Sequence, residues 1–305
     1  MTIRPWRSPT ERTPAGWTPA ERVPAGWPAP GRAEAGRPAV PLPPDPMPLR
    51  QGLRPLKQWR YVGVFGSELM FCAGSARVGP LPQVFWALWD RRSGGLDTET
   101  RFGSAPRIRV GADSVAVRSG RIRLELAVSP IGEPVEVASP HGRSYIWTRK
   151  VPVRVDGHLS RGMEVMSVSA AGILDESAGY HARDTAWEWS AGVGTSVDGW
   201  PVVWNLVRGL HDSDAVSERS VWVAGRALEA PPVRFAADLS ELWGSDGTLL
   251  RFHEEARRSR RDSFGLVSSD YVQPFGRFSG VLPGGVELSE TEPALGVMER
   301  HRAKW

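Results

Sequence analysis

The sequence predicts an all-β protein, because alternating polar and apolar residues and turn-forming pairs recur along the chain from Trp59 onward. Arg107–Val110 and Arg121–Leu126 alternate charged and aliphatic residues, a pattern that gives a strand one wet face and one buried face. Many short antiparallel strands about ten residues apart favour a barrel or a sandwich. A doubly wound α/β fold is disfavoured because alternating amphipathic helices are missing. The expected turns are Gly94-Gly95, Asp156-Gly157, Asp198-Gly199, Asp246-Gly247 and Pro283-Gly284-Gly285.

Nine further segments have the β-branched and aromatic composition of strands. In chain order they are Val84–Trp89, Ser144–Thr148, Val151–Val155, Thr185–Val193, Val202–Val207, Ser220–Val223, Val233–Ala236, Leu249–Phe252 and Arg277–Leu282. One highly charged segment, Glu254–Asp262, fits either a helix or the edge of a strand, and the sequence leaves both interpretations open.

Residues 1–44 are predicted to form a disordered, proline-rich tail. Residues 1–48 hold 13 of the 27 prolines, and the pattern Glu-Arg-x-Pro-Ala-Gly-Trp at 11–17 recurs at 21–27. Proline removes backbone donors, and the segment has few aliphatic residues whose burial would offset the entropy of ordering. We expect an extended, polyproline-like tail whose last part, Pro41–Pro48, is a candidate for an ordered arm over the domain.

Charge and cysteine content exclude several classes of protein. The formal net charge is +4, and the arginines are scattered between acidic residues without a long basic block, which disfavours nucleic-acid binding. Cys72 is the only cysteine, so an internal disulfide and a multi-cysteine zinc site are excluded, and a buried core position is expected. We find no secretory signal and no run of 18 apolar residues, and therefore expect a cytoplasmic protein without a membrane span.

The sequence also lacks the common motifs of phosphate, dinucleotide and acyl-transfer chemistry. No G-x-S-x-G, P-loop or G-x-G-x-x-G motif is present. His181, Asp184 and His211 could supply metal ligands, but residues three apart on a strand point to opposite faces. We therefore predict neither a metal site nor a cofactor.

The segment from Asp175 to Arg219 concentrates ionisable and aromatic residues, and we take it as the candidate site. Trp187-Glu188-Trp189 alternates so that both indoles share one strand face. If the strands of this segment lie side by side in the sheet, the indoles line a cavity with the ionisable groups at its mouth, as in small-molecule sites. An apolar pocket raises carboxyl pKa values toward neutrality, which suits acid–base chemistry. The other members of the cluster are Tyr180, His181, Asp184, Trp204, Asn205, His211 and Glu218.

Each of these features also has a structural explanation. Alternating tryptophans are typical of β cores, and loop carboxylates often cap turns or form ion pairs. Tyr145 and Trp147 share a strand face and are a candidate second wall of the pocket, but a strand with a basic end explains that segment as well. The C-terminal Met298–His301 is expected to be a salt-bridged strand end.

The chain resembles the family named domain of unknown function 2804 over residues 45–305. The family brings no assigned activity. The matching stretches are Pro55–Tyr61, Ser139–Gly142, Tyr145–Lys150, Asp175–His181, Trp204–Leu206 and Gly296–Arg300.

A more distant resemblance links Gly179-Tyr180-His181, Asp184 and Trp187–Trp189 to the carotenoid hydratase and AttH-like proteins. It implies two lipocalin-like β-barrels, placed here at residues 45–170 and 171–305, and acid-catalysed hydration or cyclisation of apolar polyenes and terpenoids. The usual motif of those proteins, Tyr-x-Asp-x-Asn-Trp-Gly, is replaced here by Tyr180–Ala186.

These observations lead to the hypothesis of a two-barrel protein that holds a small apolar ligand between its halves and protonates a double bond. Asp184 or Glu218 would be the acid and His181 its partner, while indole faces would stabilise developing positive charge. The alternative is a non-catalytic lipid or metabolite carrier, and a scaffold bound through the proline-rich tail is a third interpretation. The expected ligand-binding residues are Tyr145, Trp147, Tyr180, Trp187, Trp189, Trp204, Asn205 and His211.

Overall fold

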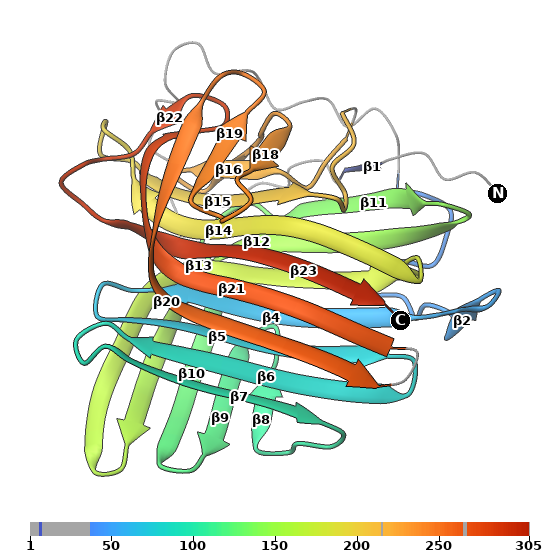
Figure 1. Cartoon of the computed structure of the whole chain (residues 1–305), viewed down its shortest axis with the longest axis horizontal. Helices are drawn as coiled ribbons and strands as arrows, with labels where there is room; N and C mark the ends of the chain where they lie inside the picture. The colour runs from blue at the N-terminus through green and yellow to red at the C-terminus, as the bar shows by residue number, and fades with distance from the viewer. Residues whose placement is uncertain (1–5, 8–36, 215, 265–266, 305) are drawn as a thin grey trace.

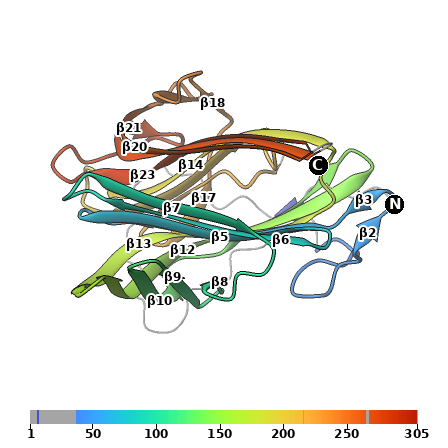
Figure 2. The same ribbon diagram turned by 60° about the horizontal axis from the view of Figure 1, so that its bottom comes forward.

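The protein folds into two large antiparallel β-sheets that stack face to face. The structure is a computed structural model that describes residues 6–7, 37–214, 216–264 and 267–304 (Figure 1). Every regular element in those ranges is a strand. Figure 2 shows the second sheet lying over the first, with each sheet curled around its own core. The prediction of an all-β fold with two packed lipocalin-like barrels is confirmed.

The first sheet has the strand order β7-β6-β5-β4-β13-β12-β10-β9-β8, and β11 pairs with β12 and β1. A separate hairpin joins β2 (Arg50–Gln51) to β3 (Arg54–Pro55). The strands of the sheet are β1 (Trp6–Arg7), β4 (Lys57–Phe65), β5 (Leu69–Val78), β6 (Leu81–Asp90), β7 (Gly95–Phe102), β8 (Ile108–Val110), β9 (Ser114–Ser119), β10 (Ile122–Pro130), β11 (Val135–His141), β12 (Ser144–Arg161) and β13 (Glu164–Gly179).

The second sheet has the order β17-β16-β15-β14-β23-β21-β20-β19-β18, with β22 paired to β21. The chain crosses from the first sheet to the second between Gly179 and Asp184, so Tyr180 and His181 lie at the crossover. The strands are β14 (Asp184–Thr195), β15 (Pro201–Arg208), β16 (Ser220–Val223), β17 (Arg226–Glu229), β18 (Val233–Phe235), β19 (Glu241–Gly244), β20 (Leu249–Phe264), β21 (Val267–Leu282), β22 (Val286–Glu287) and β23 (Ala294–Lys304).

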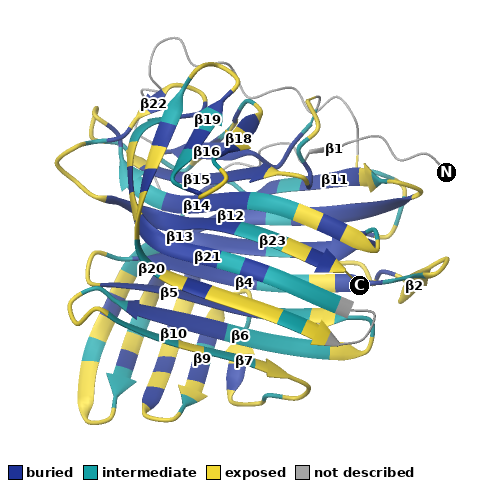
Figure 3. Ribbon diagram, viewed as in Figure 1, coloured by how far each residue is buried: buried dark blue, intermediate teal, exposed yellow. Residues whose placement is uncertain are grey.

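Strand alternation divides the apolar residues among three main cores. Successive side chains of a strand point to opposite faces, so in β4 Val62 enters the core inside the first sheet, whereas Tyr61 enters the core between the sheets. Trp204 belongs to the third core, inside the second sheet. Figure 3 shows the buried residues running along the central strands and the exposed ones gathering at hairpin ends. Cys72 is buried between the sheets, as the sequence predicted.

The longest strand of the first sheet differs from the sequence prediction. Ser144–Thr148 and Val151–Val155 are parts of the one strand β12, and the turn expected at Asp156-Gly157 is wrong. Gly157 pairs with Leu126 of β10 in mid-strand. A Cβ at Gly157 would lie 2.1 Å from the Glu125 carbonyl oxygen, so this glycine permits close strand approach and not a turn. The other four expected turns lie between strands, and the charged segment 254–262 belongs to strand β20.

Residues 37–48 run over the first sheet as an ordered arm. Leu42 and Met47 are buried against Tyr145 and Tyr180. The Tyr145 hydroxyl donates to the Pro41 carbonyl at 3.0 Å, and the Tyr180 hydroxyl donates to the Pro48 carbonyl at 2.7 Å. The rest of the predicted disordered tail, apart from residues 6–7, lies outside the described residues.

Candidate functional site

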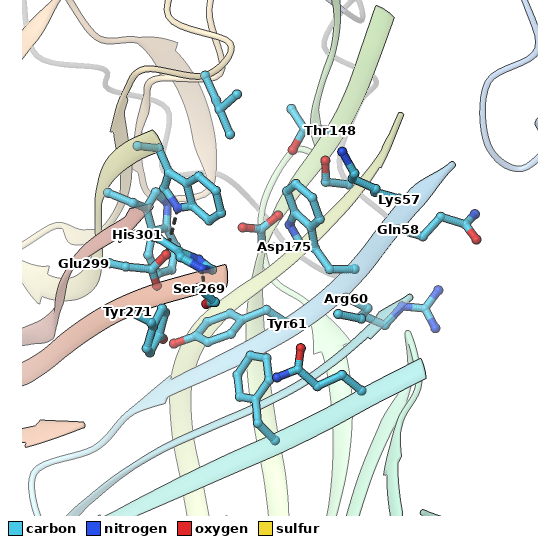
Figure 4. A pocket seen from close by; sticks show the side chains of 18 of the residues that line it. Lys57, Gln58, Arg60, Tyr61, Thr148, Asp175, Ser269, Tyr271, Glu299 and His301 are labelled. Carbon is cyan, nitrogen blue, oxygen red and sulfur yellow. Dashed lines mark hydrogen bonds between the residues drawn. The ribbon is translucent and has the colours of Figure 1, made fainter. Parts of the chain in front are cut away.

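A cavity of about 150 Å³ lies between the two sheets (Figure 4). A volume of that order accommodates an apolar group of about the size of benzene. Its aromatic wall includes Trp59 and Tyr61 from the first sheet, which face the indoles of Trp187 and Trp189 from β14. The Trp59 and Trp187 rings are stacked with centroids 6.2 Å apart, and Tyr61 meets Trp189 edge to face at 5.5 Å. The polar lining includes Lys150, Asp175, His211, Glu218, Arg258, Tyr271, Glu299 and His301.

Strand alternation sorts the residues of β12 between this cavity and the opposite face of the strand. Figure 4 shows Tyr61 of β4 and Asp175 of β13 turned into the cavity. On β12 the cavity face carries Thr148 and Lys150. Trp147, one residue away, therefore points to the opposite face.

A three-residue ion cluster forms one polar part of the cavity wall. The Lys150 ammonium lies 2.6 Å from Asp175 Oδ1 and 3.4 Å from Glu218 Oε1, and all three residues are buried. Burial raises the pKa of Glu218 to about 7 against the opposing effect of Lys150, and burial also raises the pKa of Asp175. Burial alone would lower the pKa of Lys150, but the two carboxylates outweigh it and raise this pKa. One ammonium thus faces two carboxyls, and a pKa of about 7 leaves Glu218 partly protonated at neutral pH.

A third buried carboxyl, Glu299, projects into the same cavity from β23. Trp187 Nε1 donates to its Oε1 at 2.8 Å, and Gln273 Nε2 donates to its Oε2 at 2.9 Å. Burial raises the pKa of Glu299 to about 7, while the hydrogen bond from Trp187 opposes this rise. Figure 4 shows Asp175 and Glu299 extending toward the same space from opposite sheets. The cavity is therefore lined by two buried glutamates, Glu218 and Glu299, whose pKa values are both raised to about 7.

Glu299 and His301 line the cavity, although the sequence predicted only a salt-bridged strand end for Met298–His301. His301 Nε2 lies 2.8 Å from Ser269 Oγ, and its ring centroid is 4.3 Å from that of Trp187. Burial lowers the pKa of His301 to about 3, so the imidazole is neutral. Between them, Arg300 points to the other face and pairs with Glu188 at 2.8 Å. Strand alternation was the signal in the sequence that could have identified them. It places Glu299 and His301 on the face that lines the cavity and the ion-paired Arg300 on the opposite face.

Four of the residues singled out in the sequence line the cavity, namely Trp187, Trp189, His211 and Glu218. Asn205 does not line the cavity but contacts two of the residues that do. Its Oδ1 accepts from Trp189 Nε1 at 2.7 Å, and its Nδ2 donates to the Glu218 carbonyl at 2.9 Å. Asn205 thereby fixes the position of an indole and of the Glu218 backbone.

His181 is buried next to the cavity wall, with its ring centroid 4.8 Å from that of Trp59. Its carbonyl accepts a hydrogen bond from Lys57 Nζ at 3.0 Å. Burial, reinforced by the positive charge of Lys57, holds the pKa of His181 well below its usual value. His181 is thus a neutral imidazole at the crossover between the sheets.

The remaining candidates lie elsewhere in the fold. Asp184 begins β14 on the surface, where its side chain is 75% exposed and 3.9 Å from Lys304 Nζ. Trp204 is buried inside the second sheet, where its Nε1 donates to Ser190 Oγ at 3.1 Å. Tyr145 and Tyr180 hold the arm of residues 37–48, and Trp147 lines an adjoining, open groove of about 650 Å³ beside Arg149 and Glu176. The cavity thus gathers only part of the cluster that is contiguous in sequence.

Within the described ranges there is no group of three or more His, Cys, Asp or Glu side chains that could hold a metal ion. The same part of the chain contains no helix long and apolar enough to cross a membrane.

Comparison with known proteins identifies a family. No curated protein matches the chain. Among solved structures, a putative AttH from Nitrosomonas europaea is 16% identical and has a TM-score of 0.47, with 86% of this chain and 98% of that one covered. Kievitone hydratase from Nectria haematococca is 9% identical and has a TM-score of 0.47, with 85% of this chain and 93% of that one covered. CghA with Sch210972 is 10% identical and has a TM-score of 0.38, with 87% of this chain and 95% of that one covered. The model of the domain of unknown function DUF2804 matches residues 101–305, more than half of the chain, and the protein therefore belongs to the DUF2804 family.

Proposed function

We propose that the protein binds a small, apolar, unsaturated molecule in the cavity between its sheets and transfers a proton from Glu218 to a double bond of that molecule. The observation that carries this proposal is the position of Glu218. Its carboxyl is buried beside a cavity with aromatic walls and shares the single ammonium of Lys150 with Asp175. A buried carboxylic acid kept protonated by its surroundings is a suitable proton donor at neutral pH.

The chemistry follows from the groups around the cavity. Protonation of a double bond forms a new C–H bond and leaves a carbocation, whose charge the faces of Trp187 and Trp189 stabilise. Loss of a neighbouring proton gives an isomer, attack by a second double bond gives a ring, and attack by water gives an alcohol. In each case a proton leaves at the end, and Glu299 is our candidate to receive it because it lines the same cavity.

Asp184 and His181 have different places in this proposal. Asp184 is on the surface, so of the two acids considered from the sequence we assign proton donation to Glu218. His181 is buried behind Trp59 and supports that wall of the cavity. Asn205 acts through the residues that it holds, Trp189 and Glu218.

A non-catalytic carrier is the second candidate, and one observation favours it. The ion cluster of Lys150, Asp175 and Glu218 is paired within the protein itself, as a purely structural network would be. In a carrier the aromatic wall would bind the ligand and the cluster would only stabilise the fold.

Matched variants separate the two candidates. Small molecules extracted from the protein purified from its source organism supply the compound to assay. We expect E218Q to bind this compound but to convert it at least about 10²-fold more slowly than wild type, whereas D184N keeps wild-type turnover. Thermal unfolding of both variants controls for folding. Full turnover by E218Q would contradict the assignment, and a wild-type protein that binds the compound and returns it unchanged would favour the carrier.

A further inference from the structure

Among the described residues, Arg258 differs from two other buried cations, Arg219 and Lys150. It lies on β20, is 6% exposed and lines the cavity. Arg219, which is 2% exposed, donates to the carbonyls of Ala230, Asp212 and Ser213. Lys150 faces two carboxylates. Arg258, in contrast, makes one long hydrogen bond, from Nη2 to Thr100 Oγ1 at 3.3 Å, and its Nη1 has no hydrogen-bond partner among the described residues.

Two aromatic rings hold the Arg258 guanidinium in the cavity wall. Its central carbon lies 4.4 Å from the ring centroid of Phe85 on β6 and 4.8 Å from that of Tyr271 on β21. Both contacts are cation–π interactions, which use the flat faces of the group and not its N–H edges. Because β6 and β21 belong to different sheets, the guanidinium is fixed at the interface where the cavity lies.

The charge of Arg258 has no counter-charge in ion-pair contact. None of the described carboxylates forms an ion pair with it, and the buried Glu299 already accepts one hydrogen bond at each oxygen, from Trp187 and Gln273. Burying an unpaired charge is costly unless an opposite charge or a set of hydrogen bonds compensates for it. Cation–π contacts offset only a part of that cost. Burial disfavours the charged form of Arg258, but Tyr271, Cys72 and Glu299 favour it and raise its pKa. None of the described carboxylates, however, is at ion-pair distance. An anion that enters the cavity would supply the direct partner that the guanidinium lacks.

We propose that Arg258 is an anion-binding subsite of the cavity, and that the ligand combines an apolar unsaturated part with a carboxylate. A carboxylate matches the planar N–H edge of a guanidinium in shape and charge. The aromatic walls contributed by Trp59, Trp187 and Trp189 take the apolar part. This inference rests on the proposed function, because it names the class of ligand for the same cavity.

Two probes of equal skeleton and different charge test the subsite. trans-Cinnamate and cinnamyl alcohol share a phenyl ring and a conjugated double bond, and only the first carries a carboxylate. By titration calorimetry we expect wild type to bind cinnamate at least about tenfold more tightly than the alcohol. R258Q should lose this preference while keeping its affinity for the alcohol. R260Q is the matched control, because Arg260 lies on the same strand and at the same cavity but is paired with Asp262 at 2.7 Å, and its preference should equal that of wild type.

The outcomes separate this inference from the proposed function. Equal affinity of wild type for the two probes, or an undiminished preference in R258Q, would overturn the anion subsite while leaving the apolar cavity intact. Failure of wild type to bind either probe would count against the cavity as a binding site, and so against both proposals. If R258Q does not fold, R258K replaces it. It keeps the charge but lacks the planar edge, so it should lose most of the preference, and an unchanged preference would contradict the proposal.

Discussion

The Lys150 ammonium lies 3.4 Å from the Glu218 carboxylate, and this contact joins the first sheet to the loop that precedes β16. Asp175 Oδ1 lies 2.6 Å from the same ammonium. Removing the cation from a buried pair leaves uncompensated charge, an effect of about 3–5 kcal/mol. We expect K150M to lower the free energy of unfolding in urea by that amount. The control is R154M on the same strand, where the side chain is 56% exposed, and its loss should stay below about 1 kcal/mol. Equal effects of the two variants would contradict a buried, energetically important cluster.

The pH dependence of stability should reveal the raised pKa of Glu299. Its pKa rises from 4.5 to about 7 on folding because of burial, so the folded state binds more protons than the unfolded state in that window. The contribution of Glu299 to stability is therefore complete below pH 4.5 and is lost as the pH rises toward 7. E299Q removes this loss, and its stability relative to wild type should rise between about pH 4 and about pH 8. Chemical unfolding across that range measures the difference, and a difference that is constant with pH would count against a raised pKa.

Three buried histidines affect the pH dependence of stability in the opposite direction to Glu299. Burial lowers the pKa values of His181, His211 and His301 below the usual 6.5. Their contribution is complete above pH 6.5 and is lost progressively as the pH falls below that value toward the lowered pKa values, because the unfolded chain then binds protons that the folded state does not. For this reason the E299Q comparison is made as a difference from wild type at each pH.

Asn205 is predicted to be the residue that holds the cavity wall in place. It is fully buried and hydrogen-bonds both Trp189 and the Glu218 carbonyl. N205A leaves two buried groups without partners, at about 1–3 kcal/mol each, and should also weaken binding of an apolar probe to the cavity. S190A is the control, since Ser190 accepts a hydrogen bond from Trp204 in the other core of that sheet. S190A should lower stability without changing probe binding. Unaltered probe binding by N205A would contradict the positioning role of Asn205.

The two tyrosines that hold the arm are predicted to serve stability and not ligand binding. Y180F removes the hydrogen bond to the Pro48 carbonyl, with an expected loss of about 1 kcal/mol. Hydrogen exchange should become faster in residues 40–48, while probe binding in the cavity stays at the wild-type level. Weaker probe binding by Y180F would instead give Tyr180 the ligand-binding role first inferred from the sequence.

The sequence predicted the fold and part of the site for a common physical reason. Period-two alternation is a local property, so it identified many of the strands and placed Trp187 and Trp189 on one face. Which strands become neighbours is not local. The pairing of β14 with β23, which brings Glu299 and His301 beside Trp187, depends on a register between residues more than 100 positions apart. Lys150 was treated as the basic end of a strand because its two carboxylate partners come from β13 and from the loop before β16.

Proximity in sequence was misleading for the same reason. Asp184 lies three residues from Trp187, yet it begins its strand at the exposed end. Trp204 and Asn205 are adjacent, and alternation sends the indole into the core of the second sheet while the amide faces Trp189. Asp156-Gly157 was wrongly predicted to be a turn because glycine also occurs within strands where two backbones approach closely.

The most direct test of the central claim is liquid chromatography, which separates isomers, coupled to mass spectrometry of the small molecules bound to wild type and to E218Q, both produced in the source organism. If Glu218 protonates an unsaturated ligand in the cavity, E218Q should retain the unreacted compound. Wild type should then release a product of the same mass, or of a mass greater by one water. The same compound in both proteins, or no organic ligand in either, would contradict the claim.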